Sequence, residues 1–296
     1  MENTDKKNID EELEDIVDEE ENKPSFFRKI FFMFILICII IVIYARYIGT
    51  TGLIVKEYSI KSENLPKSFN GLKLAHFSDF HYGNTTDLDN LKNIVKEINL
   101  LKADIVVFTG DLIDKNIKIS DDDISNIVSL LSSVDSTYGK YYVTGDHDVK
   151  FDRYEEVFNN SDFYNLNDKY EIILSKNNES ILISGANYKS NLKYLDELFK
   201  NELPSYKINI MHTPDTYDNI SKYNYNLVLA GHSHNGQVNI PFYGAVYTPN
   251  GAKKYYEPYY KLRSTDMYVS SGIGTSDSNF RLFNRPSFNL YRLNSK

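Results

Sequence analysis

The sequence predicts an α/β fold that follows a single membrane-spanning helix. Three observations lead to this prediction. Beyond about residue 60, short apolar segments typical of buried strands alternate with amphipathic helical segments. Several of these strands end directly at an Asp or a His. Near the N-terminus, sixteen residues from Ile30 to Ala45 pass without a charge or a proline.

The first 24 residues are predicted to form an acidic, disordered tail. Residues 1–23 carry eleven acidic and three basic side chains, a net charge of −8. Such a segment cannot bury enough apolar surface to offset the entropy of ordering it. The rest of the chain balances at 30 acids and 30 bases, which argues against a dedicated nucleic-acid-binding protein. The single cysteine, Cys38, excludes an intramolecular disulfide and a CxxC site.

The apolar run is predicted to be a transmembrane anchor over residues 25–48. A helix needs about 20 mostly apolar residues to cross a bilayer, and aromatic or apolar residues extend the run at both ends. A cleaved signal peptide is disfavoured because an acidic tail precedes the run and no A-x-A-like site follows it. A buried core helix is disfavoured because the run has no polar face. Basic residues are denser before the run than after it, which places the tail inside and the large domain on the extracytoplasmic side.

A linker over residues 49–59 is expected to lead into one domain, residues 60–296. The predicted strands and helices alternate through it, and the acidic first turn of the second helix suits the helix dipole. The predicted strands are 72–78, 104–109, 140–144, 171–174, 180–184, 207–211, 227–230, 267–271 and 288–293, and the predicted helices are 87–101, 121–134 and 192–199.

Polar side chains collect at the carboxyl ends of five of these strands. Ligands bind at that edge of open α/β sheets. Five of the six histidines lie there, and Asp79-Phe-His81 and His232-Ser-His234 repeat a spacing of two. In extended chain, residues i and i+2 point the same way, so each pair is expected to aim two ligands at one cavity. Asp and neutral His suit divalent first-row metals. The sequence therefore predicts a metal site at this edge, with His76 as a packed strand residue outside it.

At these residues the sequence resembles the calcineurin-like metallophosphoesterases. Five segments match, in order, the D-x-H, G-D, G-N-H-[D/E], H and G-H-x-H signatures of that superfamily: Asp79-Phe-His81, Gly110-Asp111, Gly145-Asp146-His147-Asp148, Met211-His212 and Gly231-His232-Ser-His234. The later Gly272-Ile-Gly-Thr-Ser276, with Arg281 and Phe283, resembles the bacterial membrane-associated phosphodiesterase subgroup. The resemblance implies a four-layer α/β/β/α sandwich of two mixed β-sheets flanked by helices.

The resemblance also implies a binuclear site of divalent cations, with Mn²⁺, Fe²⁺ and Zn²⁺ as candidates. Asp79, His81, Asp111 and His234 would hold one ion. Asp111 would bridge to a second ion held by Asp146, His212 and His232. Two such cations clamp a phosphate and lower the pKa of a bridging water so that the resulting hydroxide attacks in line. His147 would protonate the leaving group or stabilise the transition state.

The implied activity is hydrolysis of a phosphodiester in the membrane or envelope, a lipid-linked substrate included. A phosphomonoesterase or protein phosphatase is the alternative enzyme. Asp146 stands where the family usually has Asn, and the added negative charge motivates a third reading, a catalytically weak metal-binding protein. Of the weaker features, Asp148 is expected to orient a loop or a histidine beside the ligands rather than to bind a metal. Asp215 and Thr213 are expected to form a turn and a helix cap around Pro214, and the Gly272 segment to make a backbone contact near the substrate.

Overall fold

The computed structural model describes residues 26–115 and 117–296. The predicted acidic tail lies outside these residues. The chain divides into two compact units, Met1–Tyr44 and Ala45–Lys296.

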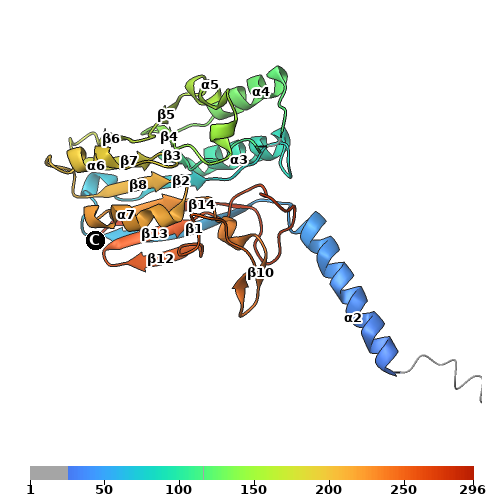
Figure 1. Cartoon of the computed structure of the whole chain (residues 1–296). Helices are drawn as coiled ribbons and strands as arrows, with labels where there is room; N and C mark the ends of the chain where they lie inside the picture. Colours follow the sequence, from blue (N-terminus) through green and yellow to red (C-terminus); the bar gives the residue numbers. More distant parts are fainter. Residues whose placement is uncertain (1–25, 116) are drawn as a thin grey trace, which may run out of the picture. The chain divides into compact units, whose positions relative to one another are not determined.

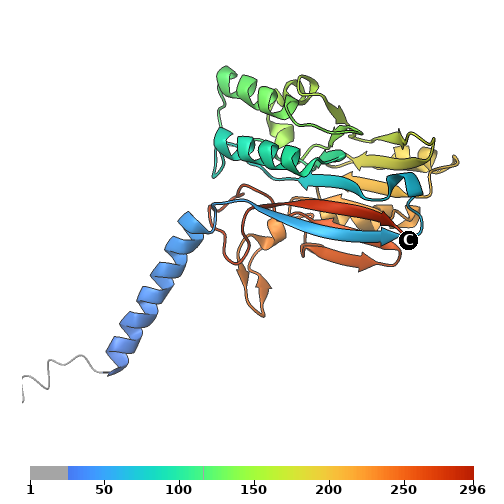
Figure 2. The same ribbon diagram turned by 180° about the vertical axis from the view of Figure 1, so that it is seen from behind.

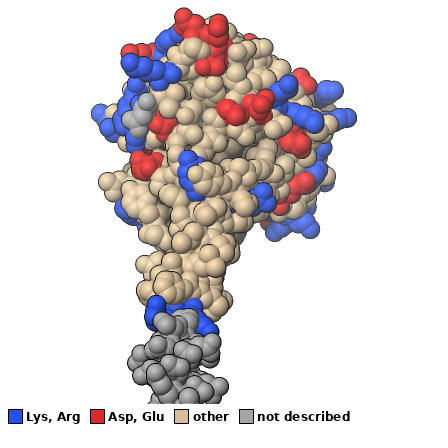
Figure 3. Space-filling model, turned by 90° about the vertical axis from the view of Figure 1, so that its right-hand side faces the viewer, with Lys and Arg blue, Asp and Glu red and all other residues tan. Residues whose placement is uncertain are grey.

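The smaller unit contains helix α2 (Phe26–Ile43), which is followed by a π-helical stretch, Tyr44–Ile48. None of the 18 residues of α2 is buried, and the 23 residues Phe26–Ile48 are long and apolar enough to cross a membrane. Figure 3 shows the surface of α2 free of charge beyond the basic side chains near its beginning. A helix that exposes apolar side chains on every side needs an apolar environment around it.

The larger unit contains two six-stranded sheets (Figure 1). The first mixes parallel and antiparallel pairs: β1 runs parallel to β14, β14 antiparallel to β2, and the remaining strands parallel to their neighbours. In spatial order its strands are β1 (Ile54–Ser62), β14 (Ser287–Ser295), β2 (Leu72–Phe77), β3 (Ile105–Phe108), β4 (Lys140–Tyr142) and β5 (Phe163–Asn165).

The second sheet is also mixed, with an antiparallel strand at each edge of a parallel centre. In spatial order its strands are β12 (Tyr259–Leu262), β13 (Thr265–Val269), β9 (Leu227–Ala230), β8 (Lys207–Met211), β7 (Ser180–Ala186) and β6 (Lys169–Leu174). A separate two-stranded hairpin joins β10 (Asn239–Ile240) to β11 (Gly244–Ala245).

Strand alternation divides the apolar side chains among three cores. In β3, Ile105 and Val107 enter the core between the two sheets, whereas Val106 and Phe108 enter the core under the helices of the first sheet. Successive side chains of a strand face opposite ways, so a strand buried on both faces reads as a continuous apolar run. The third core lies on the far face of the second sheet.

Helices cover both outer faces, as the two opposite views in Figures 1 and 2 show. On the first sheet lie α3 (Leu88–Leu101), α4 (Asp121–Ser132) and α5 (Tyr154–Asn159); on the second lie α6 (Lys193–Leu198) and α7 (Tyr217–Ile220). Asp87 caps α3 by accepting from Asn90 N–H, and Ser120 caps α4 by accepting from Asp123 N–H. The predicted four-layer α/β/β/α sandwich is confirmed.

One expected boundary is wrong. Residues 54–59 were assigned to a linker, but they form most of β1, whose nine residues pair in parallel with β14. The strand lies at an edge and its side chains are mostly exposed or half-buried. Its sequence therefore carries little of the apolar signal on which the other strands were recognised. The helix α5 and the strand β5 were missed for another reason: each is too short to show a periodic pattern.

Candidate metal centre

The five segments that carry the candidate ligands follow the carboxyl ends of β2, β3, β4, β8 and β9. Strands β2 to β4 belong to the first sheet and β8 and β9 to the second, so the candidate centre spans the mouth between the two sheets. The backbone closes the gap between neighbouring loops, since Asp79 N–H donates to Gly110 O and Gly231 N–H donates to His212 O. His232 N–H also donates to Asp79 Oδ1 at 2.9 Å, so segments 153 residues apart in the sequence meet.

The candidate ligands fall into two groups. Within each group the potential ligand atoms all lie within 4.8 Å of one another. One group is Asp79, His81 and His234; the other is Asp111, Asp146, His212 and His232. The two groups meet at Asp111, whose Oδ2 lies 3.7 Å from His81 Nε2 and 3.3 Å from His212 Nε2. One carboxylate oxygen is thus shared between both groups.

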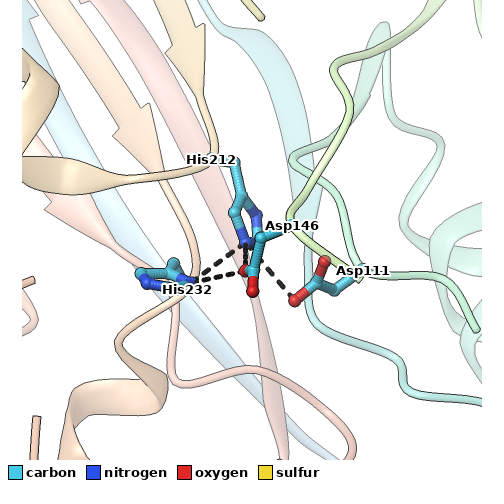
Figure 4. A group of neighbouring side chains, drawn as sticks. All are labelled: Asp111, Asp146, His212 and His232. Carbon is cyan, nitrogen blue, oxygen red and sulfur yellow. Dashed lines mark hydrogen bonds and ion pairs between the residues drawn. The ribbon is translucent and has the colours of Figure 1, made fainter. Parts of the chain in front are cut away.

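The second group is drawn in Figure 4, where all four side chains converge from different strands. Asp146 Oδ1 lies 3.1 Å from His212 Nε2 and 3.0 Å from His232 Nδ1. The two ring nitrogens lie 3.1 Å from each other. In the first group, His81 Nε2 and His234 Nε2 also lie 3.1 Å apart.

Backbone carbonyls decide which nitrogen of two histidines is free. His212 Nδ1 lies 2.7 Å from Thr109 O, and His232 Nε2 lies 2.8 Å from Asn250 O. Because a carbonyl only accepts, each of these nitrogens carries a proton. A neutral ring then leaves its other nitrogen with a lone pair, and those two nitrogens are the ones that face each other beside Asp146. Two facing lone pairs beside a carboxylate suit a cation, so the residues present fit a metal ion.

Burial and neighbouring charge shift the pKa values of the group. Burial lowers the pKa of His81 to about 4 and that of His234 well below its usual value, which keeps both rings neutral. Burial raises the pKa of Asp79 to about 6. Although burial alone would raise the pKa of Asp111, His212 holds it low, and the carboxylates in turn raise the pKa of His212 against its own burial.

The D-x-H segment and the H-x-H segment do not have the extended backbone that the sequence predicted. Asp79 and His81 have φ of 52° and 49°, and His232 and His234 have φ of 65° and 47°. Asp111 is also left-handed, with φ 62°. Non-glycine residues rarely adopt this region, and where they do the surrounding structure must compensate a cost of roughly 1–3 kcal/mol each. Left-handed turns, rather than strand alternation, point the paired side chains.

Asp148 fixes two of the ligand loops to each other. Its Oδ2 accepts from the backbone N–H of Asp111 (2.7 Å) and Gly145 (2.9 Å), and its Oδ1 accepts from Leu112 (2.8 Å). Burial raises its pKa to about 7, against these three backbone donors. The carboxylate therefore orients loops, as the sequence suggested.

His147 lies beside the two groups and lines a cavity of about 270 Å³ together with Asp111, Asp146 and His234. Its Nδ1 lies 3.3 Å from Lys115 N and 3.5 Å from Asp114 Oδ2. Asp114 Oδ2 also lies 3.7 Å from His81 Nδ1. Asp114, which is buried, was missed by the sequence reasoning, although its position three residues after Asp111 at a strand end was an available signal.

Arg281 was noticed only as part of a resemblance, but it is fully buried. Its Nη2 donates to Ser271 O (2.8 Å) and Gly274 O (2.6 Å) and lies 3.2 Å from His234 Nδ1. Gly274 N–H donates to Asp79 O at 2.8 Å. The Gly272 segment therefore supports the Asp79 loop, and its last residue, Ser276, lines the cavity. The expected approach of this segment to the substrate stays a prediction.

Two other features follow the expectations in part. His76 is a packed strand residue: it is buried, and its Nε2 lies 2.8 Å from Thr109 Oγ1. Pro214 is the first residue of a 3₁₀-helical turn, Pro214–Thr216, that follows Thr213. The Thr213 side chain makes no capping hydrogen bond to this turn. Asp215 instead accepts from the backbone N–H groups of residues 253–255 and so ties down the loop that carries Asn250.

Known proteins share this sequence pattern. The profile described as calcineurin-like phosphoesterase matches residues 72–236. The metallophosphoesterase YkuE of Bacillus subtilis is 30% identical over 264 residues, which cover 85% of this chain and 89% of that protein. The metallophosphoesterase Cj0846 of Campylobacter jejuni is 31% identical over 239 residues, which cover 77% of this chain and 60% of that protein. A crystal structure of a dimetal phosphatase from Danio rerio aligns with 76% of this chain and 93% of its own, with a TM-score of 0.48 and 12% identity.

Proposed function

This chain belongs to the calcineurin-like phosphoesterase family and is a metal-dependent phosphoester hydrolase. On that premise we propose that it is a two-metal phosphodiesterase that acts on a substrate at the membrane or envelope. The observation that carries the two-metal part is the shared oxygen of Asp111, which faces a ligand group on each side. Asp79, His81, Asp111 and His234 would hold one divalent ion, and Asp111, Asp146, His212 and His232 the other. When bound, such ions stabilise charge on phosphoryl oxygens and lower the pKa of water.

His147 is proposed to donate a proton to the leaving group. Its ring lines the cavity, and the backbone N–H of Lys115 points at Nδ1. A neutral ring with Nδ1 as acceptor carries its proton on Nε2. Asp114 Oδ2 lies 3.5 Å from Nδ1 and helps to orient the ring. A positioned acid of this kind contributes roughly 10²–10⁴-fold to such reactions.

Two features of the cavity favour a diester over a monoester. Asp146 adds a negative charge to the site, which repels a dianionic monoester more than a monoanionic diester. Lys115, the basic residue among those lining the cavity, is paired with Asp277 at 2.9 Å. Apolar side chains also line the cavity, Val238, Val246, Tyr247 and Phe280. They suit the organic group that a diester carries on its second ester oxygen.

The membrane part of the proposal rests on residues Phe26–Ile48. At about 1.5 Å per residue a helix of this length reaches across the roughly 30 Å hydrocarbon core. Arg28 and Lys29 lie at its beginning, so the positive-inside rule favours a cytoplasmic N-terminus and an extracytoplasmic catalytic domain. The competing reading is a signal sequence, in which case the mature protein would lack this helix.

The test compares two chromogenic substrates on the purified full chain in detergent with Mn²⁺. We expect bis(p-nitrophenyl) phosphate to be hydrolysed with a kcat/KM roughly tenfold above that of p-nitrophenyl phosphate, a difference of about 1.4 kcal/mol in transition-state binding. An Asp111→Asn variant prepared in parallel controls for contaminating phosphatases and should be inactive on both. A clear preference for the monoester would instead support a phosphomonoesterase or protein phosphatase.

A further inference from the structure

We propose that an exposed apolar surface beside the cavity lies against the lipid bilayer. We call it the hairpin patch; it consists of Ile240, Phe242, Tyr243, Val246, Tyr247 and Phe283, all of which are exposed. This inference rests on the membrane anchor of the proposed function and goes beyond it, because it assigns the bilayer a second contact with the larger unit.

The hairpin is built to expose its aromatic tip. Tyr243 N–H donates to Ile240 O and closes a turn with Pro241 and Phe242 at its centre. Phe242 has φ 68°, a left-handed conformation in which Gly or Asn is the usual residue. The Phe242 side chain is fully exposed and that of Tyr243 is 76% exposed. Exposing a bulky apolar side chain at such a position to water costs free energy. Contact of the hairpin tip with an apolar partner would offset that cost.

The patch is contiguous and uncharged. The hairpin projects from the sheets in both Figure 1 and Figure 2. Asn239 N–H donates to Leu282 O at 3.0 Å, so the base of the hairpin adjoins the segment that carries Phe283, which is 71% exposed. From Val238 to Pro249 the sequence contains no Asp, Glu, Lys or Arg. Contiguous exposed apolar surface of this kind marks a contact with a membrane or a partner.

The segment that carries Phe283 lies against Ala45 and Gly49, where the chain enters the larger unit. Residues 45–48, the last of the candidate span, belong to the larger unit. Arg281 N–H donates to Ala45 O at 2.9 Å, two residues before Phe283. A side chain at Gly49 would collide with Arg281 O, so the backbone leaving the span passes directly against this segment. The segment that carries Phe283 is therefore held close to residues 45–49, at the end of the candidate span.

The flanking residues suit the interface between lipid and water. Tyr and Trp concentrate at that level of a membrane, with Lys and Arg reaching to the head groups. The patch supplies Tyr243 and Tyr247, and Lys253 Nζ lies 5.2 Å from the centre of the Tyr247 ring. At the end of the span, Arg46 lies 5.2 Å from the ring of Tyr47. Tyrosines flanked by basic side chains match the interface between lipid and water. A contact with a second copy of the chain would not require this combination.

Contact with the bilayer would bring the catalytic cavity to the lipid surface. Val246 and Tyr247 belong both to the patch and to the wall of the cavity that holds His147 and His234. A phosphodiester carried on a lipid could then enter along the apolar wall while its phosphate reaches the ligand groups. The proposed contact with the bilayer therefore narrows the substrate class of the enzyme to phosphodiesters that reside in the membrane.

The test uses tryptophan fluorescence, because the chain has no Trp of its own. The full chain carrying Phe242→Trp is reconstituted in phosphatidylcholine–phosphatidylglycerol vesicles with or without bromine on the acyl chains. Tyr243→Trp is a second, independent probe. Tyr164→Trp is the matched control, since Tyr164 is 59% exposed on β5, far along the first sheet from β1. Sedimentation with the vesicles reports anchoring separately from the fluorescence.

We expect both hairpin probes to be quenched by brominated lipid at least about twice as strongly as the control, with blue-shifted emission, as interfacial indoles are. Anchored protein whose hairpin probes are quenched no more than the control would overturn the patch and leave the anchor standing. Probes shielded from aqueous iodide but insensitive to bromine would indicate a protein partner and also overturn it. Failure to sediment with vesicles would overturn the anchor and the patch together. None of these outcomes depends on activity.

Discussion

Oδ1 of Asp146 lies 3.0 Å from Nδ1 of His232. The opposite nitrogen of that ring faces Asn250 O, so Nδ1 is the nitrogen with the free lone pair. Although burial alone would raise the pKa of Asp146, the adjacent His212 and His232 rings hold it far below its usual range. Asp146 is therefore a carboxylate at neutral pH, and its negative charge is part of the site.

Replacing Asp146 by Asn, the residue usual in the family, should weaken the hold on one cation while raising turnover. The amide keeps an oxygen ligand but removes a negative charge, which leaves more net positive charge for the phosphate. We expect the dissociation constant of the weaker-bound Mn²⁺ to rise about tenfold, which corresponds to about 1.4 kcal/mol. Calorimetric titration with Mn²⁺ measures this, and kcat at saturating metal measures the turnover.

The control for that variant is Asp122→Asn, which removes the same charge from the exposed first turn of α4. It should change neither quantity. An Asp146→Asn protein with unchanged metal affinity would show that Asp146 is not a ligand. A wild-type protein without turnover, together with an active Asp146→Asn variant, would instead establish the reading of a catalytically weak metal-binding protein.

Gly272→Ala should lower metal content through a steric effect alone. A Cβ at this position would lie 2.9 Å from His234 Nδ1 and 3.0 Å from Asp79 Cβ. Gly71→Ala is the matched control, since Gly71 is also left-handed, with φ 83°, but has no atom within 4 Å of its Cβ position. Both variants should lose roughly 1–3 kcal/mol of stability from the backbone conformation. Only Gly272→Ala should also reduce the metal bound per chain, measured by elemental analysis after dialysis.

The sequence predicted most of the fold because the parallel centres of the two sheets are buried on both faces. Strands such as β3 and β9 are continuous apolar runs that end at polar residues, so their type and their ends could both be recognised. Edge strand β1 could not, since it mixes polar and apolar residues and forms no continuous apolar run. The hairpin of β10 and β11 has only two residues in each strand and leaves no periodic signal.

The candidate site was predictable as a set of side chains but not as a geometry. Short motifs singled out the candidate ligands, and the structure brings those side chains together. The left-handed conformations of Asp79 and His234 could not be inferred, since non-glycine residues rarely adopt them. The carbonyls of Thr109 and Asn250, which orient two histidine rings, are backbone groups and carry no sequence signal at all.

Asp114→Asn should slow hydrolysis in a way that depends on the leaving group. Asp114 Oδ2 faces His147 Nδ1 at 3.5 Å, so its loss removes a carboxylate that helps to orient the ring of the proposed proton donor. For an alkyl phosphodiester, whose alkoxide needs a proton to leave, kcat should fall roughly 10–100-fold. For bis(p-nitrophenyl) phosphate, whose phenolate leaves unaided, the loss should be much smaller. Equal losses on both substrates would show that Asp114 acts through His81 and the metal, and the metal content of the variant would then be reduced.

His76→Gln should flatten the pH dependence of stability on the acid side. Burial lowers the pKa of His76 to about 3 in the folded protein, whereas its usual value is 6.5. Between those values the unfolded chain binds a proton that the folded chain does not, so the free energy of unfolding falls as the pH falls, by up to about 1.4 kcal/mol per pH unit. Gln keeps a polar partner for Thr109 Oγ1 and cannot titrate.

The comparison between the two proteins isolates this effect from opposing ones. Burial raises the pKa of Asp148 to about 7 and that of Asp79 to about 6. For these carboxyls the folded state keeps a proton that the unfolded state has lost, so their contribution to stability falls as the pH rises from about 4 toward 7. Both terms are common to wild type and variant and cancel in the difference. Urea unfolding of each protein between pH 6.5 and 4.5, followed by tyrosine circular dichroism, measures the free energy of unfolding. As the pH falls, this free energy should decline more steeply in the wild type than in the variant, by a slope that corresponds to the uptake of about one proton. Parallel curves would mean that His76 is protonated in the folded state, with a rearranged contact to Thr109.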